Sequence, residues 1–531
     1  MVSRENLVEI EGDWDDSKTL FTGKAEITYP NADTFRGDIE NNIRHGHGFY
    51  RYNNGDMYDG YWHQGRKHGK GTLTYAEGTT YEGSFKNGKK SGKGRVIFST
   101  GEEYEGQFQE GKIEGEGIYS FLDGKVYKGG FKDGKLNGEG ELTFPNEDRY
   151  KGRFRDNQAE GEGVYNFKDK GQYEGQFKNG NFEGKGTYFF LKQGDMYSGD
   201  WIAGQMEGVG KYVFANKEEY VGEWKAGNKH GKGKMVFKNE DVYEGNWDMN
   251  KKIGQGEYRT KDGLHYVGNF EDGFISGKGK LTYADGSVYE GNFEMQLQEG
   301  FGVYTSKTGE IYEGNWEGNV REGKGVYKKN GLTIEAVWTS DEPSDSCVIK
   351  FPNGDAFEGS VKSGFFHGKG VYRFASGDVY EGDFLKGVFE GTGKLTFSNG
   401  AVYEGKFKEG KMNGKGILET PKYTYNGEFK EGKKDGKGSQ KYKNGDIYSG
   451  DFKGGYRHGY GEYTFSEGDV FKGNWEKGMR HGAGVHKFKE GARFEGNYNM
   501  DKKHGKGAVF LENGEIIQGE WVNDVLDNAK G

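Results

Sequence analysis

A five-residue pattern returns every 23 residues along this chain of 531 residues: an aromatic residue, any residue, glycine, any residue and a second aromatic residue. The last place of the pattern holds all nine tryptophans, which are Trp14, Trp62, Trp201, Trp224, Trp247, Trp316, Trp338, Trp475 and Trp521. A self-similar period of this length is the signature of a repeat protein, in which each repeat contacts mainly its neighbours. The chain is therefore best understood repeat by repeat.

The first aromatic residue of the pattern defines position 0 of each repeat. Twenty regular repeats follow this frame, starting at Phe35, Tyr58, Tyr81, Tyr104, Tyr127, Tyr150, Tyr173, Tyr197, Tyr220, Tyr243, Tyr266, Tyr289, Tyr312, Phe357, Tyr380, Tyr403, Tyr425, Tyr448, Phe471 and Phe494. All twenty have glycine at +2 and a Gly-x-Gly pair at +11 and +13. Position +4 is aromatic in eighteen of them, the exceptions being Ile39 and Val361. Three degenerate units begin at Ile10, Ile334 and Ile517.

The degenerate units divide the chain into five segments. These are an N-terminal degenerate capping repeat (1–34), thirteen repeats (35–333), a degenerate repeat (334–356), seven repeats (357–516), and a C-terminal half-repeat with a polar tail (517–531). The 334–356 unit lacks the Gly-x-Gly pair and has Asp-Glu-Pro where a turn is expected, so we predict a bend or an altered joint there. The last unit stops after one predicted strand, which leaves either a capped end or an edge that pairs with another copy.

Each repeat has the pattern of two short strands. Positions 0, +2 and +4 alternate with polar residues such as Glu82 and Ser84, which is the period of a half-buried strand. Positions +11, +13, +15 and +17 repeat the alternation, with +15 apolar in eighteen repeats and +17 aromatic in fifteen. Turn dipeptides such as Asn87-Gly88 and Asp123-Gly124 separate the strands. Because glycine inside a strand marks a close approach to the backbone, we expect the aromatic rings at 0, +4 and +17 to lie over the glycines.

A lone hairpin is marginal in water, so stability must come from stacking of neighbouring hairpins. The sequence therefore predicts an all-β fold, an elongated single-layer antiparallel β-sheet solenoid of about 22 stacked β-hairpin repeats. At about 4.8 Å per strand, such a twisted ribbon would extend about 200 Å.

The repeat resembles that of the MORN (membrane occupation and recognition nexus) family, whose consensus is similar to Tyr81-Glu82-Gly83-Ser84-Phe85-Lys86-Asn87-Gly88-Lys89-Lys90-Ser91-Gly92-Lys93-Gly94. The match recurs twenty times in register and covers essentially the whole chain. The chain is similar in this respect to radial-spoke head proteins of cilia and to protist cytoskeletal proteins of the family. The resemblance implies an extended β-sheet solenoid with a scaffolding or membrane-tethering role.

Composition narrows the partners and the compartment. The formal charge of -9, from 84 acidic and 75 basic residues, lacks the cationic excess that nucleic acid binding requires. One cysteine, Cys347, fits a reducing compartment. No apolar run exceeds four residues, so we expect neither a signal peptide nor a membrane span. The predicted location is the cytoplasm, and the resemblance implies the cytoskeleton or a cilium.

No pattern predicts catalysis, a cofactor or a metal site. Equivalent residues of neighbouring repeats are expected roughly 10 Å apart, too far to share a zinc ion bound at about 2.0 Å. This applies to the seven histidines at +10, which are His45, His68, His230, His367, His458, His481 and His504. The Gly-x-Gly pairs lack the third glycine and the helix of a phosphate-binding loop. Cys347 has no histidine phased beside it as a base, and the acidic residues at +1 are expected to be cross-strand charge partners.

Position +9 is predicted to lie in a loop, changes between basic and apolar residues along the chain, and carries the candidate binding residues. Its apolar members predict a surface for a protein partner: Ile113, Leu136, Phe182, Met206, Phe366, Phe389 and Met412. Its basic members predict a contact with anionic lipid: Arg44, Lys67, Lys90, Lys434, Arg457, Arg480 and Lys503. The alternative is that +9 packs at the margin of the sheet, where lysine and arginine stems cover apolar surface as methionine or leucine would.

The function we expect is a non-enzymatic scaffold or adaptor that binds other proteins of a cytoskeletal or ciliary complex. The axonemal, radial-spoke-like setting rests on the resemblance alone. One alternative is a peripheral membrane tether that binds anionic phospholipids, and another is a regulatory subunit of a phosphatidylinositol phosphate kinase. We also expect two copies to pair through an array end, and we expect no nucleic acid partner.

Overall fold

The computed structural model describes residues 7–527, which form two compact units. The first unit holds the described residues up to Gly263 together with Phe270–Gly273. The second holds Leu264–Asn269 and the described residues from Phe274 onward. Regular structure in the described residues consists of strands without helices. Residues 1–6 of the predicted capping repeat and residues 528–531 of the predicted tail lie outside the described residues.

The first unit contains the strands β1 (Leu7–Trp14), β2 (Phe21–Thr28), β3 (Thr34–Glu40), β4 (Ile43–Arg51), β5 (Met57–His63), β6 (Arg66–Thr74), β7 (Thr80–Lys86), β8 (Lys89–Ile97), β9 (Glu103–Gln109), β10 (Lys112–Ser120), β11 (Val126–Lys132), β12 (Lys135–Thr143), β13 (Arg149–Arg155), β14 (Gln158–Phe167), β15 (Gly171–Lys178), β16 (Asn181–Phe190), β17 (Asp195–Ile202), β18 (Gln205–Val213), β19 (Glu219–Lys225), β20 (Asn228–Val236), β21 (Val242–Asp248) and β22 (Lys251–Arg259). The division between the units falls within β23 (His265–Glu271).

The second unit contains the strands β24 (Phe274–Thr282), β25 (Val288–Glu294), β26 (Leu297–Thr305), β27 (Ile311–Glu317), β28 (Val320–Lys329), β29 (Leu332–Thr339), β30 (Glu342–Lys350), β31 (Ala356–Lys362), β32 (Phe365–Arg373), β33 (Val379–Leu385), β34 (Val388–Thr396), β35 (Val402–Lys408), β36 (Lys411–Glu419), β37 (Tyr423–Lys430), β38 (Lys433–Tyr442), β39 (Ile447–Lys453), β40 (Tyr456–Thr464), β41 (Val470–Glu476), β42 (Met479–Lys487), β43 (Arg493–Asn499), β44 (Lys502–Phe510), β45 (Ile516–Val522) and β46 (Val525–Asp527).

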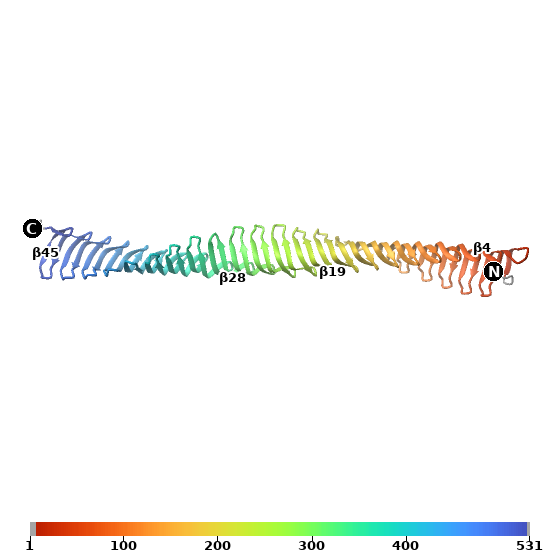
Figure 1. Cartoon of the computed structure of the whole chain (residues 1–531), viewed down its shortest axis with the longest axis horizontal. Helices are drawn as coiled ribbons and strands as arrows, with labels where there is room; N and C mark the ends of the chain where they lie inside the picture. Colours follow the sequence, from red (N-terminus) through yellow and green to blue (C-terminus); the bar gives the residue numbers. More distant parts are fainter. Residues whose placement is uncertain (1–6, 528–531) are drawn as a thin grey trace. The chain divides into compact units, whose positions relative to one another are not determined.

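Strands that follow one another in sequence pair antiparallel within each unit, as the ladder of hairpins in each unit shows (Figure 1). Tyr58 lies opposite Leu73 inside its hairpin, and Leu73 lies opposite Tyr81 of the next hairpin. Position 0 and position +15 therefore alternate in one row across the strands. The predicted all-β, single-layer antiparallel array of hairpins is confirmed.

The turns follow the residues that the sequence places there. Inside a hairpin, Asn87 and Gly88 both have positive φ, 52° and 89°, as a two-residue turn that matches the strand twist requires. Between hairpins, the Tyr52 amide donates to the Asp56 carbonyl at 2.8 Å, and the Gly55 amide donates to the Tyr52 carbonyl at 3.0 Å. Every repeat is thus a hairpin with one tight turn, and a slightly longer turn leads to the next hairpin.

The aromatic core explains the glycines at +2 and +13. Tyr58 is fully buried, and its hydroxyl donates to the Tyr61 carbonyl at 2.9 Å. This bond holds the ring flat on the sheet, where a Cβ atom at Gly71 would lie 2.4 Å from the hydroxyl oxygen and 2.7 Å from the ring. A Cβ atom at Gly60 would lie 2.6 Å from the same oxygen. The predicted ring-over-glycine contact is confirmed at position 0.

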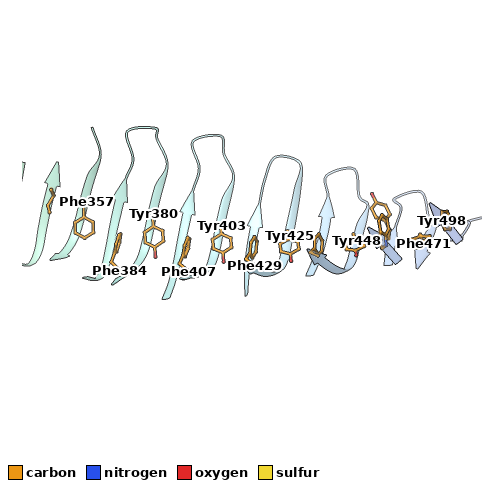
Figure 2. Close-up of a cluster of buried hydrophobic side chains, with 14 of the residues drawn as sticks. Phe357, Tyr380, Phe384, Tyr403, Phe407, Tyr425, Phe429, Tyr448, Phe471 and Tyr498 are labelled. Carbon is orange, nitrogen blue, oxygen red and sulfur yellow. The ribbon is translucent and has the colours of Figure 1, made fainter. Parts of the chain in front are cut away.

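The rings at +4 and +17 have other neighbours. In the second unit, the Tyr380 ring meets Phe384 of its own repeat and Phe407 of the next repeat edge to face, with centroids 5.1 and 4.9 Å apart (Figure 2). A tryptophan at +4 also bonds to the preceding repeat, since Trp62 Nε1 donates to a glycine carbonyl at 3.1 Å. At +17 the expected contact with glycine is wrong, because these rings lie against the +15 ring, as Tyr52 does against Tyr50 at 4.5 Å.

Glycine at +11 differs from the regular strand residue that the alternation predicts. Gly69 has φ of +63°, and the pairing shifts between Gly60 and Trp62, which marks a bulge. The extra residues of β6 bring Lys67 directly opposite Trp62. The bulge therefore turns position +9 onto the aromatic face of the sheet.

The degenerate unit supports the steric account of the glycines. Its position 0 is Ile334, which carries no ring, and here Ala336 and Cys347 stand opposite each other where two glycines are the rule. The strands β29 and β30 still form an antiparallel hairpin, with Asp341 at positive φ in the turn and Pro343 inside β30. The bend predicted at this unit stays a prediction.

The last unit is a hairpin, where the sequence analysis expected a single strand. The short strand β46 pairs with β45, and Trp521 lies opposite Leu526. The Leu526 side chain lies over Gly519, within 2.8 Å of where a Cβ atom would be. An aliphatic residue thus takes the place that an aromatic ring has in complete repeats.

Candidate functional site

The aromatic face of the sheet carries the candidate +9 side chains, because each of them stands opposite the +4 residue of its own repeat, which is aromatic except at Ile39 and Val361. Phe182 is paired with Phe177, just as Lys67 is paired with Trp62. The bulge at +10 to +12 produces this register. Within each unit, the predicted candidates for partner and lipid contact therefore belong to one row on the aromatic face.

The apolar +9 residues pack into the aromatic core. Phe182, Phe366 and Phe389 stack on the ring at position 0 of their own repeats, with centroids 3.8–3.9 Å apart. Leu136 is buried. The other three candidates are partly buried, and these are Ile113, Met206 and Met412. Their packing fits the alternative of a structural role, while contact with a protein partner stays a prediction.

The basic +9 residues turn their charged ends toward the rings. In all seven, the charged group lies 4.2–5.3 Å from the centroid of its nearest ring, and these residues are Arg44, Lys67, Lys90, Lys434, Arg457, Arg480 and Lys503. Burial lowers the pKa of the four lysines, and that of Lys434 falls to about 8. A cation held against a ring gains about 0.5–2 kcal/mol from the ring quadrupole. These side chains thus complete the core, and lipid contact stays a prediction.

The rings at positions +15 and +17 form a further pair, which covers the core beside the turns between hairpins. Seven repeats have tyrosine at +15 and an aromatic residue at +17, and in each the two ring centroids are 4.1–4.7 Å apart. The series is interrupted in the second unit, where Tyr304 and Tyr327 are followed at +17 by Ser306 and Lys329. Two consecutive repeats there lack the covering ring.

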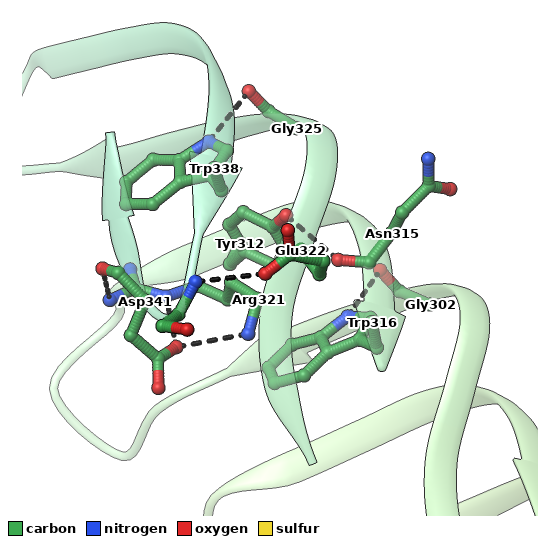
Figure 3. Close-up of polar contacts among 10 residues, drawn as sticks. Gly302, Tyr312, Asn315, Trp316, Arg321, Glu322, Gly325, Trp338 and Asp341 are labelled. Atoms are coloured by element: carbon green, nitrogen blue, oxygen red, sulfur yellow. Dashed lines mark hydrogen bonds and ion pairs between the residues drawn. The ribbon is translucent and has the colours of Figure 1, made fainter. Parts of the chain in front are cut away.

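A pocket of about 650 Å³ opens at this interruption, and we call it the aromatic pocket. Its walls include Tyr304, Trp316, Arg321, Tyr327 and Asp341. Arg321 Nε donates to Asp341 Oδ1 at 2.8 Å, and a guanidinium NH group donates to the Asp341 carbonyl at 2.7 Å (Figure 3). The walls combine aromatic surface with a fixed ion pair, as is common in binding sites.

Sequence reasoning missed the aromatic pocket, although its signal was in the chain. Position +17 is aromatic in fifteen repeats, and two of the exceptions, Ser306 and Lys329, are consecutive. The consequence could not be anticipated because the expected contact of the +17 rings with glycine was wrong. Where a +17 ring is present, it lies against the +15 tyrosine. Only this contact shows that the absence of two +17 rings leaves +15 tyrosines uncovered.

The opposite face is polar and follows the paired glycines. In the first unit it forms a groove of about 1220 Å³ with glycines along its floor and with Glu82, Glu105, Lys93 and Lys128 among its walls. The walls carry both signs of charge, so the groove does not select an anion or a cation.

Cys347 and the +10 histidines are the residues that the sequence offered for chemistry, and the structure shows the surroundings of several of them. Cys347 is buried, which raises the pKa of its thiol to about 11, and its Sγ donates to the Gly359 carbonyl at 3.2 Å. His63 lies between His45 and His68, with ring centroids 5.2 and 5.4 Å apart. In residues 7–527, no group of three or more histidine, cysteine, aspartate or glutamate side chains is arranged to hold a metal ion. That part of the chain also has no helix of the length and apolarity needed to cross a membrane.

Comparison with known families gives a match over most of the chain. A family model described as MORN repeat matches residues 35–57, 58–80, 81–103, 104–126, 127–149, 150–172, 173–190, 197–218, 220–242, 243–265, 266–288, 289–311, 312–333, 357–379, 380–402, 403–424, 425–447, 448–470, 471–493 and 494–509. No curated protein is a significant match to the chain.

Solved structures give only remote likenesses. The TCP domain of SAS-4 (dCPAP) from Drosophila melanogaster, in complex with a proline-rich motif of Ana2 (dSTIL), is 14% identical, with 34% of this chain and 90% of that chain covered and a TM-score of 0.20. A streptogramin B lyase is 13% identical over 50% of this chain and 81% of its own, with a TM-score of 0.11. Virginiamycin B lyase from Staphylococcus aureus is 12% identical over 57% and 88%, also with a TM-score of 0.11. At these TM-scores the likenesses carry no argument.

Proposed function

Because the chain belongs to the MORN repeat family, we propose that it is a non-enzymatic scaffold that binds protein partners through the aromatic face of its sheet. MORN repeats are in general non-catalytic modules that bind proteins or membranes. The observation that carries the choice of a protein partner is the aromatic pocket, where Tyr304, Trp316 and Tyr327 line an opening in the aromatic core. Aromatic surface around a recess is typical of the centres of protein interfaces.

The basic residues at +9 favour a protein partner over a lipid surface. A lysine or arginine adds about 1 kcal/mol to membrane binding when its charge reaches the headgroups. The Arg457 guanidinium instead lies 4.2 Å from the Trp475 ring centroid, and Lys434 Nζ lies 4.4 Å from that of Tyr423. These charged groups lie against rings of the aromatic core, so a membrane tether would need other residues to contact lipid.

The setting in the cell is a further proposal. The family resemblance supports a place in a cytoskeletal or ciliary assembly, with other proteins of that assembly as partners. No observation on the aromatic face favours a regulatory role toward a phosphatidylinositol phosphate kinase. Fluorescence microscopy of the tagged chain in its native cell tests this setting, and a signal at the plasma membrane alone would contradict it.

A photo-crosslinking residue at an exposed position beside the aromatic pocket tests the proposed function. Lys307 is suitable, because it is exposed and its amide donates to Ser287 Oγ on the pocket wall at 3.2 Å. Glu313 is the control, since it is exposed and neighbours Tyr312 in β27, so it points to the polar face. We expect a covalent polypeptide adduct from position 307 and none from position 313. Adducts with lipid alone, or salt-sensitive flotation of the protein with anionic liposomes, would favour the membrane tether instead.

A further inference from the structure

The aromatic pocket lies where other repeats hold the ring of their own +17 residue. Phe167 shows the usual neighbours of such a ring: its centroid lies 4.1 Å from that of Tyr165, the +15 residue of the same repeat. It lies 5.9 Å from Tyr188 and 6.3 Å from Phe182, the +15 and +9 residues of the next repeat. A +17 ring is therefore enclosed by two +15 rings and one +9 side chain.

The corresponding neighbours of Ser306 are Tyr304, Tyr327 and Arg321. All three line the aromatic pocket. The pocket thus has the walls of a +17 ring site, while the chain supplies only a serine for it.

Two further contacts distinguish this site from filled ones. In four repeats with a +17 ring, the +15 tyrosine and the next tryptophan have centroids 5.5–6.2 Å apart and ring planes inclined by 35–43°. Tyr304 lies 6.4 Å from Trp316 at 63°, and Tyr327 lies 6.3 Å from Trp338 at 57°. The rings around the pocket are therefore more loosely packed than those around a filled site.

The Tyr304 hydroxyl is also free to bind. In an equivalent place, the Tyr212 hydroxyl donates to Asp195 Oδ2 at 2.7 Å. Serine stands at the position of that aspartate in the Tyr304 repeat, and Ser287 Oγ donates to Asp285 at 3.0 Å instead. Within residues 7–527, the Tyr304 hydroxyl has no hydrogen-bond partner. A donor thus remains available at the wall of the pocket.

We propose that the aromatic pocket receives one aromatic side chain from an extended segment of a protein partner, which supplies from outside the ring that the repeat lacks. This inference rests on the proposed function. A ring between Tyr304 and Tyr327 would gain tilted contacts with both, and the Arg321 guanidinium would lie beside its face. The Tyr304 hydroxyl can donate to a carbonyl of the bound segment. The rings, and not the charge of the walls, select the anchor, because Arg321 is accompanied in the walls by the carboxylates of Asp285, Glu310 and Asp341.

Refilling the site from within the chain tests the proposal directly. Ser306→Phe places at +17 an aromatic residue, as seven other repeats with a +15 tyrosine have, six of them phenylalanine, and its ring should occupy the pocket. Ser306→Ala is the matched control, because both variants lose the bond from the Glu310 amide to the Ser306 hydroxyl, which is 3.0 Å long. The probe is p-cresol, the side-chain analogue of tyrosine, and its binding to the full chain is measured by saturation-transfer NMR.

We expect p-cresol to bind the wild-type chain and Ser306→Ala equally, and to bind Ser306→Phe at least tenfold more weakly. Absence of p-cresol binding to the wild-type chain, equal binding to Ser306→Phe, or displacement of p-cresol by n-butylamine would overturn the proposal. If Ser306→Phe does not fold, Tyr327→Leu is expected to weaken p-cresol binding, and unchanged binding there counts equally against the proposal.

Cross-linking from position 307 separates this inference from the proposed function. Loss of the polypeptide adduct in Ser306→Phe, with retention in Ser306→Ala, is expected if an aromatic anchor holds the partner. An adduct that persists undiminished in Ser306→Phe would overturn the anchor and leave the scaffold function standing. Absence of any polypeptide adduct in the wild-type chain would overturn both.

Discussion

Replacing Gly71 by alanine is expected to open one hairpin of the array while its neighbours remain folded. The new Cβ atom would lie 2.4 Å from the Tyr58 hydroxyl oxygen, so the ring has to leave its place on the sheet. Overpacking of a filled core costs about 1–3 kcal/mol, and loss of the bond from Tyr58 to the Tyr61 carbonyl costs about 1 kcal/mol more. We therefore expect a local destabilisation of about 3 kcal/mol.

Hydrogen exchange of the full chain, resolved to β5 and β6, measures this local opening. A change of about 3 kcal/mol corresponds to exchange about 150-fold faster. The decisive comparison is a double-mutant cycle with Tyr58→Val, which removes the ring and keeps a strand-forming residue. In that background, Gly71→Ala should be neutral or slightly stabilising, because alanine then has space and costs less chain entropy than glycine.

A glycine of the turn provides the control. A Cβ atom at Gly88 would meet no heavy atom within 4 Å, but the residue has φ of +89°. Gly88→Ala should cost only about 1 kcal/mol from backbone strain, and the same amount with or without the Tyr58 ring. If Gly71→Ala destabilises equally in both backgrounds, the glycines at +13 are not explained by ring packing, and this reasoning fails.

Three further predictions concern single side chains. Burial lowers the pKa of Lys434 to about 8, so the folded chain binds this proton less tightly than the unfolded chain and the resulting penalty disappears as pH rises from about 8 to above 10. Lys434→Met should accordingly change the melting temperature more favourably at pH 7 than at pH 10, whereas the same pH dependence in the exposed Lys433→Met would contradict the argument. Cys347 should resist alkylation by iodoacetamide at pH 8 until the protein is unfolded, because it is buried and its thiol pKa is raised to about 11; rapid labelling of the native chain would contradict its packing. Arg457→Leu should destabilise its repeat less than Arg457→Ser, by about 1 kcal/mol in chemical denaturation, because the side chain covers the Trp475 ring; equal effects would show that this contact adds nothing.

The period of the sequence was sufficient to predict the hairpins, their antiparallel stacking and the ring over the glycine pair. Those features depend on spacing alone: a ring at Tyr58 and glycines at Gly60 and Gly71 recur at fixed intervals. The bulge at Gly69 could not be predicted from the alternation of residues. Glycine adopts both left-handed and extended backbone conformations, so the sequence does not reveal that Gly69 is left-handed.

The candidate site was harder to predict because it depends on which way a side chain turns. The basic residues at +9 were predicted as lipid contacts from their charge, yet the register places Lys67 against Trp62, and its charge lies over rings. The aromatic pocket depends on residues that are absent at Ser306 and Lys329. The effect of a missing +17 ring can be inferred only when the contacts of the +17 rings in other repeats are known.

The packing of ring on glycine also determines how a chain of this kind can change its length. Tyr58, Gly60 and Gly71 belong to one repeat, so each 23-residue segment contains both the ring and the glycines on which the ring packs. Duplication or loss of a whole segment leaves the packing of ring on glycine intact in all other repeats. Single-residue changes are confined to the turns between hairpins, as in the interval of 24 residues from Tyr173 to Tyr197. The distance between sites on such a protein is therefore adjustable in units of one hairpin, without a new core having to evolve.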